Sequence, residues 1–233
     1  MKKYILPLMF IFCTGVALLV TGCLSRQPSM RESAEIHLEQ RYGGTFEFFA
    51  PRGVSRMNPD VRAMEFRREG ATEWADNILV VGHRQEDGSI VFRDNYLAVR
   101  FRHEMAAFIR DAANAVFGEA IIFYGVSAIS TLSPDLPANA TFEEYSTDAE
   151  SRIFAHIVLR EEQFEESLAE EFALKFQNAG IISTFNISVV SDDVFRTSAD
   201  ISLINPPIDL VGMRQVARVN SNPTEIRVEL RGE

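Results

Sequence analysis

The four histidines are the residues of this chain best suited to acid–base or metal chemistry. Imidazole titrates near neutral pH, and several imidazoles together can hold a zinc ion. The pair His103-Glu104 opens the His-Glu-x-x-His pattern of zinc proteases, but Ala107 stands where that pattern requires the second histidine. The four are far apart in sequence, and we expect them to be partly exposed on helix and strand surfaces: His37, His83, His103 and His156. His156 alternates with apolar neighbours, which predicts that it lies on the polar side of a strand.

The serines and glycines form no recognised catalytic or phosphate-binding motif. Ser127 lies in Gly125-Val126-Ser127-Ala128, which lacks the second glycine of a Gly-x-Ser-x-Gly nucleophile turn, so we interpret it as a strand-end residue. No Gly-x-Gly-x-x-Gly or Walker loop is present, and Gly43-Gly44 is better explained as the end of a helix. The sequence therefore predicts no catalytic residue, no metal site and no bound cofactor.

Although no known catalytic motif is present, an enzymatic alternative stays open. A hydrolase or a solute-binding subunit with an unrecognised site would use His83, His103 or His156 together with nearby carboxylates. Such a site requires two histidines, or a histidine and a carboxylate, to converge within about 3 Å in a concave pocket.

The carboxylates are numerous, but their spacing is not that of metal ligands. Residues 161–171 hold six glutamates on the helix face opposite Phe164, Leu168 and Phe172, which is typical of a solvated face. Asp94-Asn95 and Asp192-Asp193 are predicted to be short acidic turns without the ligand spacing of an EF-hand loop. This pattern leaves open only a weak surface cation site.

The charge of the chain disfavours nucleic acid as a partner. The net charge is −10, and removal of a leading segment that contains Lys2 and Lys3 would take it to −12. Nucleic-acid binding needs a basic face that neutralises phosphates, and this composition offers none. The same acidity argues against adhesion to anionic lipid by charge.

Both cysteines, Cys13 and Cys23, lie in the first 23 residues. Met1-Lys2-Lys3 is basic, residues 5–20 are mostly apolar, and Thr21-Gly22 supplies small residues before Cys23. The apolar run is slightly short for a membrane span, which needs about 20 residues, and its flanks favour a cleaved signal segment over a retained transmembrane helix. Cleavage before Cys23 would leave the folded part without any cysteine, and so without disulfides, cysteine-bound zinc or a thiol nucleophile.

This segment resembles the signal peptide and lipobox of a bacterial lipoprotein, although Val20 stands where that family most often has leucine. The resemblance implies that signal peptidase II cuts between Gly22 and Cys23 after Cys23 receives its lipid. Two or three acyl chains, palmitate among them, would then anchor the chain to the extracytoplasmic face of the cell membrane. The membrane would be one partner, and an envelope protein could be another.

Two further segments, residues 38–48 and 94–100, are similar to parts of Gram-positive lipoproteins of unknown function. The resemblance implies no activity. Its structural content is a helix running into the first strand of a sheet, and a later strand running into a helix.

Hydrophobic periodicity predicts alternating helices and strands. The elements expected in the first half are helix 30–42, strand 45–49 ended by Pro51 and Gly53, a short strand near 64–66, hairpin strands 77–84 and 89–93 around Asp87-Gly88, helix 101–118 and strand 120–126. The elements expected in the second half are strand 151–159, helix 163–178, strand 181–190, strand 199–204 and strand 225–230.

These elements predict an α+β fold, with amphipathic helices packed on a largely antiparallel sheet. The predicted divisions are a signal peptide at 1–22, a lipidated tether at 23–30, an α+β region at 31–130, a junction loop at 131–150 and a second α+β region at 151–233. The two regions could form one domain or two. Residues 89–126 and 151–190 share the order strand, helix, strand. This order indicates either a weak internal repeat that arose by duplication or only an arrangement that is common in α+β folds.

Overall fold

The computed structural model describes residues 28–54, 59–72, 76–126, 136–148, 150–198 and 212–231. Cys23, the predicted signal peptide, Ser127 and the predicted strand at 199–204 lie outside these residues. The described part is an α+β fold of two mostly antiparallel sheets with helices packed against them, as the sequence predicts. None of the described helices is long and apolar enough to cross a membrane.

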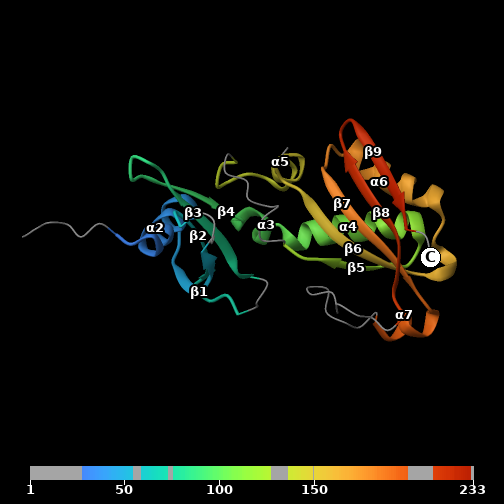
Figure 1. Cartoon of the computed structure of the whole chain (residues 1–233). Helices are drawn as coiled ribbons and strands as arrows, with labels where there is room; N and C mark the ends of the chain where they lie inside the picture. Colours follow the sequence, from blue (N-terminus) through green and yellow to red (C-terminus); the bar gives the residue numbers. More distant parts are fainter. Residues whose placement is uncertain are drawn as a thin grey trace, which may run out of the picture.

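The first sheet joins β1 (Phe46–Val54), β2 (Val61–Arg68), β3 (Ile78–Arg84) and β4 (Ile90–Asp94) in sequence order, and every pair is antiparallel. Helix α2 (Met30–Tyr42) packs on one face of it. Figure 1 shows this unit in blue and teal. Met30, Ala34 and Leu38 recur every fourth residue and enter the core of this unit, because that spacing places them on one side of a helix.

Local sequence sets the ends of these elements. Ser29 caps α2 through a reciprocal pair of hydrogen bonds: Glu32 N donates to Ser29 Oγ, and Ser29 N donates to the Glu32 carboxylate. The predicted hairpin is confirmed, with Gly88 at φ +84° in its turn. The prediction that Pro51 and Gly53 end β1 is wrong. β1 is an edge strand with register shifts at these positions, where a missing backbone N–H is tolerated.

The second sheet runs in the order β5 (Ile121–Tyr124), β6 (Ile153–Arg160), β7 (Ser183–Val190), β8 (Arg214–Asn222) and β9 (Glu225–Leu230). Only β6 and β7 are parallel. Helices α3 (Tyr96–Arg100) and α4 (Arg102–Phe117) lead into this unit, and a 3-10 turn, Glu161–Gln163, precedes α6 (Glu166–Asn178). α4 and α6 contribute to the large core on one face of the sheet. Figure 1 places this unit beside the first.

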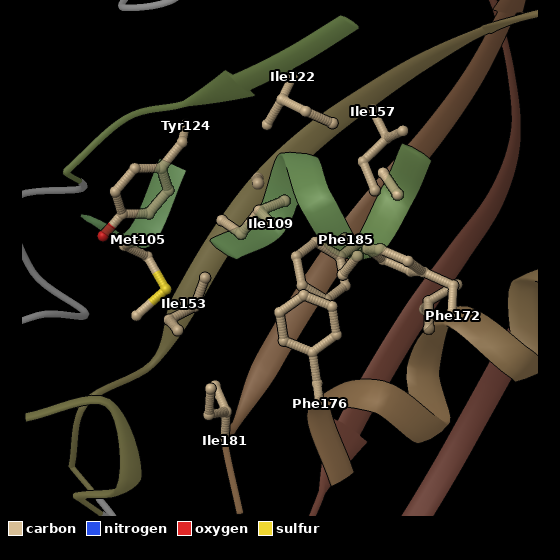
Figure 2. Close-up of a cluster of buried hydrophobic side chains, with 14 of the residues drawn as sticks. Met105, Ile109, Ile122, Tyr124, Ile153, Ile157, Phe172, Phe176, Ile181 and Phe185 are labelled. Atoms are coloured by element: carbon tan, nitrogen blue, oxygen red, sulfur yellow. The ribbon is translucent and has the colours of Figure 1, made fainter. Parts of the chain in front are cut away.

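The centre of the large core is a group of three phenylalanines. Phe172 and Phe176 come from α6 and Phe185 from β7, and their ring centroids lie 4.5 to 5.0 Å apart. All three are fully buried. Figure 2 shows them together with Met105 and Ile109 of α4, so one cluster joins both helices to the sheet.

The boundary between the two sheets differs from the predicted one. It falls near residue 95, between β4 and α3, and not in the predicted junction loop at 131–150. The described part of that loop contains α5 (Phe142–Thr147), capped by Thr141 and Glu144. Tyr145 of α5 is 1% exposed and stacks on Phe101 with ring centroids 5.6 Å apart, so this segment belongs to the second core.

The two strand–helix–strand segments are arranged differently. β4 and β5 lie in different sheets, whereas β6 and β7 are parallel neighbours in one sheet. The order of elements that the sequence suggested is present in both segments, but their topology is not shared. This difference in topology favours a common α+β arrangement over an internal duplication.

The sequence did not predict α3, α5, α7 or β8. β8 carries an extra residue, Val216, at a register shift against β7, which breaks its period of two. Helix α7 (Asp192–Ser198) follows directly on β7. Its Phe195 covers a small apolar cluster on the sheet face opposite α4 and α6, formed by Ile121, Phe123, Val158 and Val190.

The phenylalanine group gives a stability prediction. Phe185→Ala should lower the free energy of unfolding by about 3–5 kcal/mol, because it leaves a cavity among rigid neighbours. The matched control is Leu174→Ala on α6, a side chain 44% exposed, which should change stability by less than about 0.5 kcal/mol. Urea denaturation followed by circular dichroism measures both. Equal effects would contradict this account of the core.

Candidate functional site

A buried carboxylate lies where the two units meet. Asp94 ends β4 and is 2% exposed. Its Oδ2 accepts from His37 Nε2 at 3.1 Å and from Arg41 at 3.4 Å, and its Oδ1 accepts from the Tyr42 hydroxyl at 2.7 Å. The backbone N–H of Tyr96 also donates to Oδ1, at 3.0 Å. The sequence-based interpretation of Asp94 as part of an acidic surface turn is therefore wrong.

The network satisfies Asp94 completely. Each carboxylate oxygen accepts two hydrogen bonds, and Arg41 supplies a positive charge. Burial, assisted by the neighbouring Asp94 carboxylate, raises the pKa of Tyr42 far above its usual value, so this hydroxyl remains a donor. The His37–Asp94 pair thus has the separation expected of a catalytic dyad, but its carboxylate has no oxygen left for a substrate. We interpret it as a structural element.

This network also connects the two units. Arg41 uses its second terminal nitrogen to donate to the backbone carbonyl of Leu136 at 2.7 Å. Arg102 of α4 pairs with Asp76, which precedes β3. Asn95, buried next to Asp94, accepts from the backbone N–H of Leu79 at 2.7 Å. The arrangement holds α2, the end of β4 and the start of the second unit together.

The structure does not bring the other predicted histidines together. His83 is exposed at the end of β3, and His103 is exposed on α4 beside Arg102, whose Nε donates to it at 3.2 Å. Among the described residues, no group of three histidine, cysteine, aspartate or glutamate side chains could hold a metal ion. The six glutamates of residues 161–171 are all exposed, as predicted for a solvated face.

His156 lies on the polar side of β6, as the alternation of its neighbours predicts. Its Nε2 is 2.8 Å from the Ser188 hydroxyl of β7, and burial lowers the pKa of the imidazole. This separation suits a serine nucleophile and its base. However, Ser188 is 0% exposed, so a substrate cannot reach its oxygen without rearrangement of the sheet. The pair can form hydrogen bonds but is not placed for nucleophilic attack.

The wider surroundings of His156 are a set of polar side chains on one face of the second sheet. We call the face opposite α4 and α6 the outer face, and α7 covers only the end of it near Val158. Beyond that end, Asn186 accepts from Gln215 at 3.0 Å, and Thr184 donates to Asn220 at 2.9 Å. Arg218 lies in the same row across the sheet as His156 and Asn186. This arrangement can recognise a ligand by hydrogen bonding and charge. Sequence reasoning missed it because β8 was not predicted.

The Asp94 network gives a prediction that distinguishes a structural role of this carboxylate from a catalytic one. Asp94→Ala should lower the free energy of unfolding by about 3–5 kcal/mol, because it removes the acceptor of several buried donors and the anion that pairs with Arg41. Tyr42→Phe removes one hydrogen bond and should lower it by only about 1 kcal/mol. Urea denaturation measures both. A fully stable Asp94→Ala protein would contradict the structural role.

The environment of His156 predicts a pH dependence of stability. In the folded protein the pKa of the His156 imidazole lies below its ordinary 6.5, so the unfolded chain binds a proton at this imidazole more readily. The contribution of His156 to stability is therefore complete only above pH 6.5. Lowering the pH from about 7 to about 5 should therefore destabilise the wild type more than His156→Gln. Thermal unfolding at each pH tests this. Parallel pH profiles for the two proteins would refute it.

Comparison with known proteins identifies no family. No protein-family model matches the sequence, and no curated protein matches it. Among solved structures, the chain is similar to a DUF5037 family protein from Ruminococcus gnavus, with 11% sequence identity and a TM-score of 0.35, over 76% of this chain and 81% of that chain. A likeness at this level carries no conclusion about the site.

Proposed function

We propose that this protein is a membrane-anchored extracytoplasmic lipoprotein whose folded part has a non-catalytic binding or structural role in the cell envelope. The observation that carries the proposal is the sequence around Cys23, in which a basic start and an apolar run lead to small residues directly before the cysteine. Lipid on Cys23 would supply the anchor, because two acyl chains are enough for stable attachment.

The position of α2 sets the reach of such an anchor. The N-cap of α2 is Ser29, six residues after Cys23. Six residues span at most about 20 Å. The first sheet and α2 would therefore stay close to the membrane surface, and the acidic folded part would gain nothing from charge attraction to anionic lipid.

The non-catalytic part of the proposal is supported by the two histidine contacts. The carboxylate beside His37 is saturated by other donors, and the hydroxyl beside His156 is buried. The outer face of the second sheet instead offers half-buried hydrogen-bonding groups on a rigid scaffold, which suits binding. The alternative, a lipid-anchored hydrolase, would need Ser188 to become accessible.

The anchor is tested by metabolic labelling with an alkyne analogue of palmitate. Cys23→Ala should abolish labelling and leave a precursor that still carries residues 1–22, because the attachment atom is lost. Cys13→Ala is the matched control, since it removes the other cysteine but keeps labelling and cleavage. Labelling that persists in Cys23→Ala would sink the lipoprotein assignment, whatever the folded part binds.

A further inference from the structure

We infer that the outer face of the second sheet binds a short acidic peptide, with Arg218 as its principal charged contact. The inference rests on the binding role proposed above and names the class of partner. It is drawn from a cation without a partner, several amide side chains and an exposed aromatic ring, all on the outer face among the described residues.

Arg218 is the first observation. Its Nε is buried and has no hydrogen-bond partner, and the guanidinium forms no ion pair with any described residue. Glu229 lies directly opposite it in the strand register, but that carboxylate pairs with Arg227 at 3.1 Å. A buried unpaired donor is costly, and a charged one more so. A carboxylate ligand would satisfy it, because guanidinium and carboxylate form two parallel hydrogen bonds.

The neighbours of Arg218 on this face match the chemistry of a peptide backbone. Asn186 and Asn220 flank it on β7 and β8, and Gln215 lies further along β8. Amide side chains both donate and accept, as peptide groups do. Asn186 and Asn220 each use their side-chain oxygen as an acceptor in these contacts, and Gln215 uses its nitrogen to donate to Asn186 and to the Ala217 carbonyl, so the nitrogens of the two asparagines and the oxygen of Gln215 are left for a ligand.

Phe154 and Arg152 extend the surface along β6. Phe154 points to the outer face because Ile153 and Ala155 are buried on the other one, and its ring is 41% exposed. Arg152, two residues earlier, is exposed and has no ion pair among the described residues. Strand spacings place the α-carbons of Arg152 and Arg218 about 16 Å apart. An extended peptide of five residues spans at most about 17 Å, so its two ends could reach both cations.

Charge complementarity selects an acidic partner. The chain has a net charge of −10, yet this face carries two arginines, Arg218 and Arg152, that form no ion pair among the described residues. Of the acidic groups beside them, Glu229 is paired with Arg227, Glu150 lies two residues before Arg152 and is paired with Arg93, and Glu225 is at the outer end of β9. The rows around Arg218 and Phe154 therefore carry a local excess of positive charge, which would attract carboxylates and repel basic peptides.

The test uses the full chain purified in detergent and the hexapeptide Ser-Asp-Ala-Gly-Ala-Asp, labelled at its N-terminus with tetramethylrhodamine. Fluorescence anisotropy should show saturable binding. A matched peptide with asparagine in place of both aspartates and an amidated C-terminus should bind at least about tenfold more weakly. Arg218→Gln should weaken binding of the acidic peptide by about tenfold, and Arg152→Gln by about threefold, because the latter side chain is exposed.

Arg110→Gln is the control, since Arg110 is likewise half-buried and has no ion pair among the described residues, but lies on α4, in the opposite layer. It should bind as the wild type does. Equal binding by Arg218→Gln and wild type, or equal binding of the acidic and amide peptides, would overturn the inference. Displacement by free acetate at the same carboxylate concentration would also overturn it, by showing a site for small anions. Any of these results with Cys23 still labelled would leave the anchor intact.

Discussion

The carboxylate of Asp94 is the constraint on which the arrangement of the two units depends. A buried charge is tolerated only when its hydrogen bonds are made, and here three side chains of α2 and one backbone N–H of α3 make them. Because these donors belong to different elements, α2 cannot leave the first sheet without exposing an unpaired charge. The same network reaches Leu136, so the position of the second unit is tied to α2.

The sequence predicted the elements whose signals are local. The fourfold spacing of α2 and the Asp-Gly turn after β3 each depend on a few neighbouring residues, and both were placed correctly. The errors arise where tertiary context decides. Pro51 continues β1 because that strand is at an edge, and β8 escaped detection because Val216 interrupts its alternation. The capping box of Thr141 and Glu144 was a readable signal for α5 that the proline-rich composition obscured.

The candidate site was less predictable than the fold, for a physical reason. Alternation along β6 identifies the side of the sheet on which His156 lies, but not what lies beside it on the neighbouring strand. Its partner, Ser188, comes from a strand that is parallel and separated by a helix, so only the register of β6 and β7 joins them. Asp94 shows the same limit, since its partners in α2 precede it by more than fifty residues.

The two faces of the second sheet show how the fold distributes its stability. One face is closed by α4 and α6 over interlocking aromatic rings. On the other face Asn186 pairs with Gln215 and Asn220 with Thr184, whereas Arg218 has no partner among the described residues. A buried donor without a partner lowers the stability of the free protein, and a folded chain has only about 5–15 kcal/mol in total. The large apolar core allows the outer face to retain such a group, and a ligand that pairs with it would recover the lost free energy on binding.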